Sequence, residues 1–316
     1  MPTRRYAFRI FRLLGIDVYL HWSWLVIALV RIQLVQYRGY SSRIWYVIEY
    51  LALFLIVLMH EFGHALACRQ VGGRANQIVL WPLGGVAYVS PPQRPGAVLW
   101  SIAAGPLVNV ALLPIFFTFW LCSGFLGWPE FLPDLHLFIR TLLQIDILLL
   151  VFNLMPFYPL DGGQILRSLL WFLFGRANSL MIASIVGFVG VAGLGLFAGL
   201  VFLGGGPQSG VGAAWIGILA AFMGFNCWAG FRQALALSKL EKAPRRPEFA
   251  CPVCRASPPV GDFWGCSRCR KSFDIFLTQG FCPHCNAEYT STACPFCYGL
   301  RPTAEWRNFQ TAPPSP

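Results

Sequence analysis

Long uninterrupted runs of apolar residues dominate the first 240 residues of the chain. Six segments approach or exceed the roughly 20 residues that a helix needs to cross a bilayer. They cover about 18–37, 45–69, 96–122, 135–174, 179–204 and 211–237. The fourth is too long for one crossing, and Pro156, Pro159 and the pair Gly162-Gly163 interrupt it. We expect a helix, an irregular break and a second helical piece in this segment.

A different pattern occupies residues 76–89, Asn-Gln-Ile-Val-Leu-Trp-Pro-Leu-Gly-Gly-Val-Ala-Tyr-Val. It predicts two short strands around a Pro-Leu-Gly-Gly turn. The expected fold is therefore an α-helical polytopic membrane protein. It has six transmembrane spans, a short membrane-associated β-hairpin and a small module after the last span.

Composition excludes an ordinary soluble domain, because 56% of the 316 residues are hydrophobic and only 12% are charged. The net charge is +11. The Lys and Arg residues of the chain are concentrated at the N-terminus, in alternate loops and after the last span. By the positive-inside rule both termini are cytoplasmic. The basic charge is then mainly topological and argues only weakly for nucleic acid as a partner.

The composition changes at a polar linker, residues 241–249, which separates a membrane-embedded core at 1–240 from the tail. Eight of the 11 cysteines follow in four CxxC pairs: Cys251/Cys254, Cys266/Cys269, Cys282/Cys285 and Cys294/Cys297. This spacing predicts two structural zinc sites of four thiolates each, in a tandem zinc ribbon at 250–300. A disulfide framework is disfavoured because the cytoplasm keeps thiols reduced.

The pairing of these knuckles is open at this stage. The simplest arrangement joins the first two pairs in one site and the last two in the other, and an interleaved arrangement is the alternative. His284 could replace a cysteine ligand, although a role as bystander in its turn is favoured. We expect residues 301–316 to form a disordered tail.

The strongest chemical signal is His60-Glu61-Phe62-Gly63-His64, which follows an apolar run without charges. On a helix, residues four apart share a face, so His60 and His64 can hold one metal ion, with Glu61 beside it as a general base. Hydrolytic zinc needs a third protein ligand. Asp161, a carboxylate at the break in the fourth segment, is the candidate, because an intramembrane carboxylate is costly. A helix-capping or salt-bridging role is the alternative.

At this point the chain resembles the site-2 protease family of intramembrane zinc metalloproteases. The resemblance rests on His60–His64, on Gly105-Pro-Leu-Val-Asn109 and on Asn153 through Gly163, and it covers roughly residues 15–240. Leu80–Ala87 and His21-Trp-Ser-Trp are similar to the compact bacterial and archaeal branch with a six-span core. The resemblance implies that His60, His64 and Asp161 bind one catalytic Zn²⁺ and that Glu61 is the base.

The resemblance also implies that Asn109 and Asn153 lie near the active site. They would hold the substrate backbone or stabilise the oxyanion, or they would only bridge helices. Asp146 lies on a helix face similar to that of Asn153. It could pair with Arg140 or line the cavity, and we assign it no catalytic role.

These inferences predict an intramembrane zinc endopeptidase in a bacterial cytoplasmic membrane. It would cut within or near transmembrane segments of membrane-tethered proteins, by zinc-activated water with Glu61 as base. Its partners are a membrane protein substrate, the lipid bilayer and a cytoplasmic protein at the zinc ribbons; nucleic acid is disfavoured. The hairpin could pair with an extended substrate or only close the site. The competing functions are a catalytically silent scaffold for the ribbons and a metal transporter.

Overall fold

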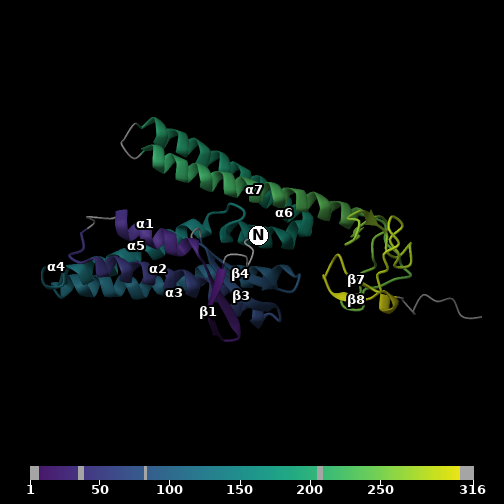
Figure 1. Ribbon diagram of the computed structural model, residues 1–316, viewed down its shortest axis with the longest axis horizontal. Coiled ribbons are helices and arrows are strands. Elements are labelled where there is room, and N and C mark those ends of the chain that lie inside the picture. The colour runs from purple at the N-terminus through teal and green to yellow at the C-terminus, as the bar shows by residue number, and fades with distance from the viewer. Residues whose placement is uncertain (1–6, 35–38, 82–83, 205–208, 307–316) are drawn as a thin grey trace, which may run out of the picture. The chain divides into compact units, whose positions relative to one another are not determined.

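The computed structural model describes residues 7–34, 39–81, 84–204 and 209–306 (Figure 1). Contacts divide the chain into two compact units. The first contains Met1–Gly175 with Ser179–Phe231, and the second contains Arg176–Asn178 with Arg232–Pro316. We describe each unit by itself.

Within the described ranges, five helices are long and apolar enough to cross a membrane. They are α2 (Arg43–Gln70), α3 (Pro95–Phe125), α5 (Pro133–Leu154), α6 (Asp161–Leu203) and α7 (Ser209–Lys242). In α7 the candidate membrane span covers Gly212–Lys242. Large apolar side chains such as Leu148, Val189 and Phe225 are mostly exposed on them. Such surfaces suit a lipid environment better than water.

The helices depart from the six expected spans in the first segment and at the junction of the fourth and fifth segments. The first segment, 18–37, starts inside strand β2 (Ile16–His21) and continues as the 12-residue helix α1 (Ser23–Leu34); residues 35–38 lie outside the described ranges. The break in the fourth segment is present, because α5 ends at Leu154 and α6 starts at Asp161. Helix α6 then joins the second piece to the fifth segment, with one non-helical residue, Gly175. A short helix, α4 (Trp128–Phe131), precedes α5.

A four-stranded sheet has the order β1-β2-β3-β4. The expected hairpin at 76–89 is confirmed by antiparallel β3 (Arg74–Trp81) and β4 (Gly84–Ser90). Strand β1 (Ala7–Leu13) pairs antiparallel with β2 across Leu14-Gly15, which both have positive φ, and β2 runs parallel to β3. This sheet leaves β4 at one edge.

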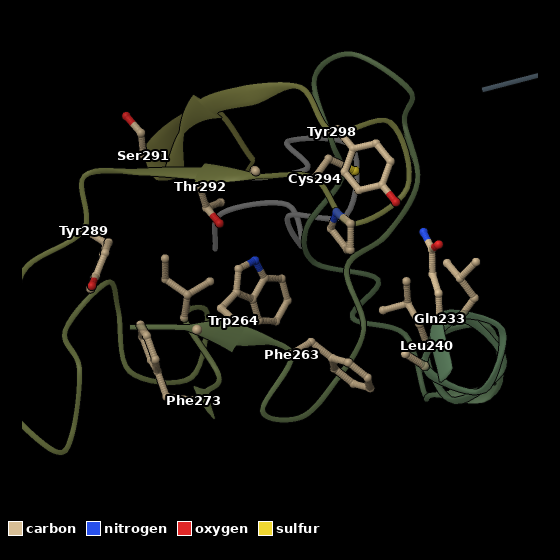
Figure 2. A pocket seen from close by; sticks show the side chains of 16 residues that line it. Gln233, Leu240, Phe263, Trp264, Phe273, Tyr289, Ser291, Thr292, Cys294 and Tyr298 are labelled. Carbon is tan, nitrogen blue, oxygen red and sulfur yellow. The ribbon is translucent and has the colours of Figure 1, made fainter. Parts of the chain in front are cut away.

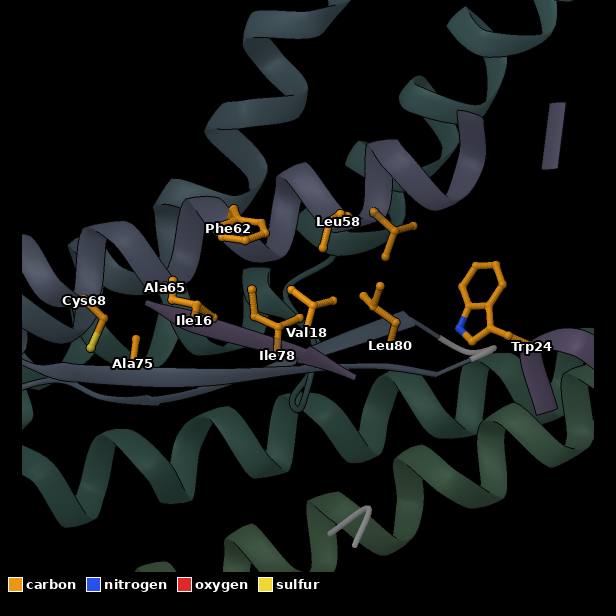
Figure 3. Close-up of a cluster of buried hydrophobic side chains, with 11 residues drawn as sticks. Ile16, Val18, Trp24, Leu58, Phe62, Ala65, Cys68, Ala75, Ile78 and Leu80 are labelled. Carbon is orange, nitrogen blue, oxygen red and sulfur yellow. The ribbon is translucent and has the colours of Figure 1, made fainter. Parts of the chain in front are cut away.

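The apolar core of the first unit lies between the sheet and α2 (Figure 3). Ile16, Val18, Ile78 and Leu80 point from the strands toward Leu58, Phe62 and Ala65 of α2. These α2 positions follow the helical spacing of one face. The sheet therefore fixes the rotation of α2, and with it the direction of the His60 and His64 side chains on the same helix.

The second unit is a small module with little regular structure. Its strands are β5 (Trp264–Gly265), β6 (Ser272–Phe273), β7 (Ser291–Ala293) and β8 (Leu300–Pro302), followed by the 3-10 helix η2 (Thr303–Trp306). The order extends beyond residue 300, where we expected a disordered tail, because fully buried Trp306 packs against Phe276. Residues 307–316 of that expected tail lie outside the described ranges.

Asp274 joins two parts of this module. Its carboxylate accepts hydrogen bonds from Arg246 at 2.6 Å and from the Gly261 N–H at 2.8 Å. Burial by itself would raise the pKa of the Asp274 carboxyl. Hydrogen bonds from Gly261, Leu277 and Arg246 outweigh that effect and hold the pKa below its usual value. The carboxylate is therefore charged at neutral pH and fastens the start of the module to its centre.

A cavity of about 560 Å³ lies within the second unit (Figure 2). Trp264 and Thr292 line its middle, while Gln233 and Leu240 of α7 line one side. The lining is mainly aromatic and aliphatic, and it includes none of the residues of the histidine motif.

Candidate metal centre

Three ligand atoms converge at the motif helix. His60 Nε2 lies 3.1 Å from His64 Nε2, and Asp161 Oδ2 lies 3.0 Å and 3.3 Å from the two nitrogens. Four ligands at about 2.0–2.1 Å from a tetrahedral zinc ion lie roughly 3.3 Å from one another. The three atoms thus have the spacing of three corners of a zinc site. A donor set of two imidazoles and one carboxylate, with a fourth corner open, fits catalytic zinc.

The ring orientation of each histidine is fixed through its other nitrogen. His64 Nδ1 lies 2.9 Å from the carbonyl oxygen of Ser101, which can only accept a hydrogen bond. His60 Nδ1 lies 2.6 Å from Asn109 Oδ1. Both rings therefore carry hydrogen on Nδ1 and present the Nε2 lone pair to the metal position, as metal-binding histidines require. Side-chain exposure of 4% for His60 and 8% for His64 keeps these contacts dry.

Asp161 comes from a distant part of the chain. It is the first residue of α6, directly after the Pro-containing break that separates this helix from α5. A carboxylate in the first turn of a helix is favoured by the exposed N–H groups there. The break thus allows the chain to place a charged ligand against α2, where a continuous helix would expose no free N–H groups.

Glu61 lies against the edge strand β4. Its Oε2 accepts a hydrogen bond of 2.8 Å from the backbone N–H of Ala87, and only 5% of the residue is exposed. Gly85 makes this approach possible, because a Cβ at that position would overlap the Glu61 carboxyl group. The carboxylate is thereby held beside the two histidines with one oxygen free of this contact.

Gly105 of α3 leaves the space that both imidazoles occupy. A Cβ at this position would overlap the Nε2 atoms of His60 and His64. Gly105→Ala should therefore displace the rings and lower the zinc affinity of this site by about 10-fold or more, as losses of ligand support commonly do. Zinc release from the purified full chain against a graded chelator series measures this, with Gly124→Ala on the same helix as control because that position is open. Zinc release from Gly105→Ala at the wild-type chelator concentrations would contradict this geometry.

Comparisons with known proteins point to one family. The model of peptidase family M50 matches residues 48–134 and 134–197. Zinc metalloprotease MJ0392 of Methanocaldococcus jannaschii is 30% identical over 184 residues, covering 58% of this chain and 51% of that protein. The putative zinc metalloprotease Rip3 of Mycobacterium tuberculosis is 28% identical over 233 residues, covering 70% and 57%. Over residues 48–197 the chain is similar to peptidase family M50.

A solved structure, the site-2 protease from Methanocaldococcus jannaschii, is 27% identical with a TM-score of 0.48 and covers 72% of this chain and 96% of that one. The chain spans about half the length of the curated relatives it matches. The match to the M50 family and the five apolar helices support an integral, multi-pass membrane protein. The histidine motif, Gly105, Asn109 and Asp161 all lie inside the residues matched by the M50 family.

The two asparagines that the resemblance places near the active site lie in different surroundings. Asn109 is fully buried between the His60 ring and the carboxylate of Asp146, and its Nδ2 donates to Asp146 Oδ1 at 2.6 Å. Asn153 is half-buried in the last turn of α5. The sequence suggests that Asp146 pairs with Arg140 or lines the cavity, whereas in the structure its carboxylate accepts from Asn109. An ionisable residue inside an apolar helix was the signal that could have assigned it to the site.

The eight tail cysteines form two clusters, and the pairing differs from the simplest expectation. Cys251 and Cys254 join Cys294 and Cys297, while Cys266 and Cys269 join Cys282 and Cys285. The outer knuckles thus enclose the inner ones, which is neither adjacent nor interleaved pairing. Sulfur atoms across each cluster lie 3.5–3.7 Å apart. Thiolates at about 2.3 Å from a tetrahedral zinc would lie roughly 3.8 Å apart.

All four knuckles share one turn. In each, the carbonyl of the first cysteine accepts from the N–H four residues on, as in Cys251 with Arg255 and Cys294 with Tyr298. That fourth residue has positive φ in every knuckle: Arg255, Arg270, Asn286 and Tyr298. The turn aims N–H groups at the sulfur. The Cys269 N–H and the Tyr289 hydroxyl lower the pKa of the Cys266 thiol to about 5, which favours the thiolate that zinc binds.

Proposed function

We propose that this chain is an intramembrane zinc endopeptidase that hydrolyses peptide bonds within or near transmembrane segments of membrane-tethered proteins. One observation carries the proposal. His60 Nε2, His64 Nε2 and Asp161 Oδ2 converge within 3.0–3.3 Å on apolar helices, with the Glu61 carboxylate beside them. Relatives named as zinc metalloproteases support it. A silent scaffold for the zinc ribbons would not require this complete set.

Zinc bound by such ligands acts as a Lewis acid and makes water a usable nucleophile near neutral pH. Within the chain, Glu61 takes the proton from the attacking water and later passes it to the leaving nitrogen. The hydrogen bond from Ala87 keeps the carboxylate in reach of both tasks. Burial of His60 and His64 limits competing water around the reacting groups.

The open edge of β4 offers a place for the substrate. At one point on this edge strand the Ala87 N–H already donates to Glu61. An extended segment paired along the rest of the edge would take hydrogen bonds from the remaining outward N–H groups of β4, as in other cases of strand addition. It would then present its carbonyl groups beside Glu61. The alternative is a hairpin that only closes the site.

Ala87→Pro tests the hydrogen bond that holds Glu61. Proline removes the N–H, and edge positions of a sheet tolerate it. Because the Ala87 N–H positions the proposed base, kcat/KM for a model transmembrane substrate should fall about tenfold, which corresponds to one main-chain hydrogen bond of roughly 1.4 kcal/mol. Ala87→Ser retains the N–H and serves as the control. Cleavage by Ala87→Pro at the wild-type rate would show that this hydrogen bond is not needed to position Glu61.

The experiment that tests the proposed function is reconstitution of the full chain in lipid vesicles with a model transmembrane substrate. We expect products cut within or next to the apolar segment, loss of cutting when zinc is chelated, and recovery when zinc is returned. Zinc-loaded protein that cuts none of a panel of transmembrane substrates would count against the proposal.

We further propose three zinc ions per chain, one at the histidine motif and two in the tail, with both termini in the cytoplasm of a bacterial cell. The tail would bind a cytoplasmic protein. Its mainly apolar cavity and modest charge, with aromatic side chains such as Phe273 packed inside the module, favour protein contact over nucleic acid.

A further inference from the structure

Three buried polar side chains from three helices form one hydrogen-bonded chain. His60 of α2 contacts Asn109 of α3 at 2.6 Å, and Asn109 contacts Asp146 of α5 at 2.6 Å. His60 is 4% exposed, and both other residues are 0% exposed. This hydrogen-bonded series ends at Asp146, whose hydrogen-bond partner among the described residues is Asn109.

The order of donors along this chain has a physical consequence. An asparagine amide can face its neighbours in two orientations, with either oxygen or nitrogen toward the histidine. A carboxylate only accepts hydrogen bonds, so Asp146 holds the NH₂ group of Asn109 and turns the amide oxygen toward His60. That oxygen in turn only accepts, so the His60 hydrogen stays on Nδ1 and the Nε2 lone pair stays on the metal side.

Stability alone gives no reason for a carboxylate at this position. Asp146 is completely buried, and its Oδ2 meets no hydrogen-bond donor among the residues that the structure describes. A buried charged group is costly, and an apolar side chain of similar volume is commonly tolerated as well or better. The carboxylate of Asp146 therefore acts on the side chain of Asn109, which donates to it.

The two histidines also differ in how they are held. The carbonyl of Ser101 orients His64 through the backbone, which side-chain substitution leaves in place. His60 depends on two side chains in series. Removal of the terminal carboxylate should therefore affect one ligand of the metal position and spare the other.

We propose that Asp146 is a positioning residue that fixes His60 as a zinc ligand through Asn109. The link to catalysis rests on the proposed function, whereas the link to zinc binding does not. Zinc affinity is therefore the primary readout, and cleavage is the second.

The test uses the full-length protein, loaded with zinc and dialysed against a graded series of chelator concentrations. Asp146→Leu should release one of the bound zinc ions at about 10- to 100-fold lower chelator concentration than wild type. Asp146→Asn keeps an acceptor oxygen, so it should release this zinc ion at a chelator concentration between those of wild type and Asp146→Leu. Leu143→Ala on the same helix changes a buried side chain outside the hydrogen-bonded chain. It should lower thermal stability without shifting zinc release.

A double-mutant cycle separates positioning from a general structural role. If Asp146 acts through Asn109, the double variant Asn109→Leu/Asp146→Leu loses no more zinc affinity than Asn109→Leu alone. Additive losses, or zinc release from Asp146→Leu at the wild-type chelator concentration, would overturn the proposal. Should wild type hold zinc tightly but cut no substrate, the proposed function fails while the ranking of these variants still decides the role of Asp146.

Discussion

Glu61→Gln should abolish proteolysis and leave the metal in place. Glutamine has the size of glutamate, and its amide oxygen can still accept the Ala87 N–H, so the side chain keeps its position against Gly85. An amide is not a base, however, and cannot take a proton from water. We expect cleavage to fall by about 10²- to 10⁴-fold, the usual contribution of a positioned general base. Zinc content and cleavage rate measured on the same preparation check both halves.

Glu130→Gln is the matched control, because Glu130 lies exposed in α4 outside the metal centre. It should cut like wild type. If Glu61→Gln retains zinc and also retains cleavage, Glu61 is not the base. The proposed hydrolytic mechanism at this motif would then be wrong.

The nested arrangement of the tail predicts a specific zinc count. Cys251→Ser/Cys294→Ser removes two ligands from one cluster, so the protein should lose one zinc ion and keep the other tail site. Adjacent pairing would make the same double variant lose two. Binding of a structural zinc ion contributes on the order of 10–16 kcal/mol in small zinc modules. The affected half of the module should therefore unfold, which amide hydrogen exchange can follow.

Cys251→Ser/Cys266→Ser is the companion variant, with one ligand removed from each cluster. The nested arrangement predicts that both tail sites are weakened by it, whereas adjacent pairing predicts damage to only one. The nested pairing would be refuted if Cys251→Ser/Cys294→Ser damaged both tail sites and Cys251→Ser/Cys266→Ser damaged only one.

Local patterns predicted the parts of the site that depend on local spacing. The separation of His60 and His64 by four residues fixes a shared helix face, and the proline-rich break indicated an irregular segment before Asp161. Bringing Asp161 to the histidines is a long-range event, for which the scarcity of intramembrane carboxylates was the available guide. Each tail knuckle was likewise predicted from its CxxC spacing.

The missed features depend on contacts between distant segments. Hydropathy does not distinguish a buried strand from the start of an apolar helix. The sequence therefore did not predict strand β2, which overlaps the apolar segment 18–37. Proximity in the sequence points to Arg140 as a partner of Asp146, but its partner in the structure, Asn109, lies on another helix. The nested pairing of Cys251 with Cys294 depends on how the knuckles pack, which their spacing does not encode.

The most direct measurement is the location of zinc in an experimental structure of the full chain, by anomalous scattering at the zinc edge. We predict one peak among His60 Nε2, His64 Nε2 and Asp161 Oδ2, at about 2.0–2.2 Å from each, with Glu61 adjacent but not a ligand. A zinc-loaded crystal with no peak between these atoms, or with Asp161 turned away from both imidazoles, would contradict the account.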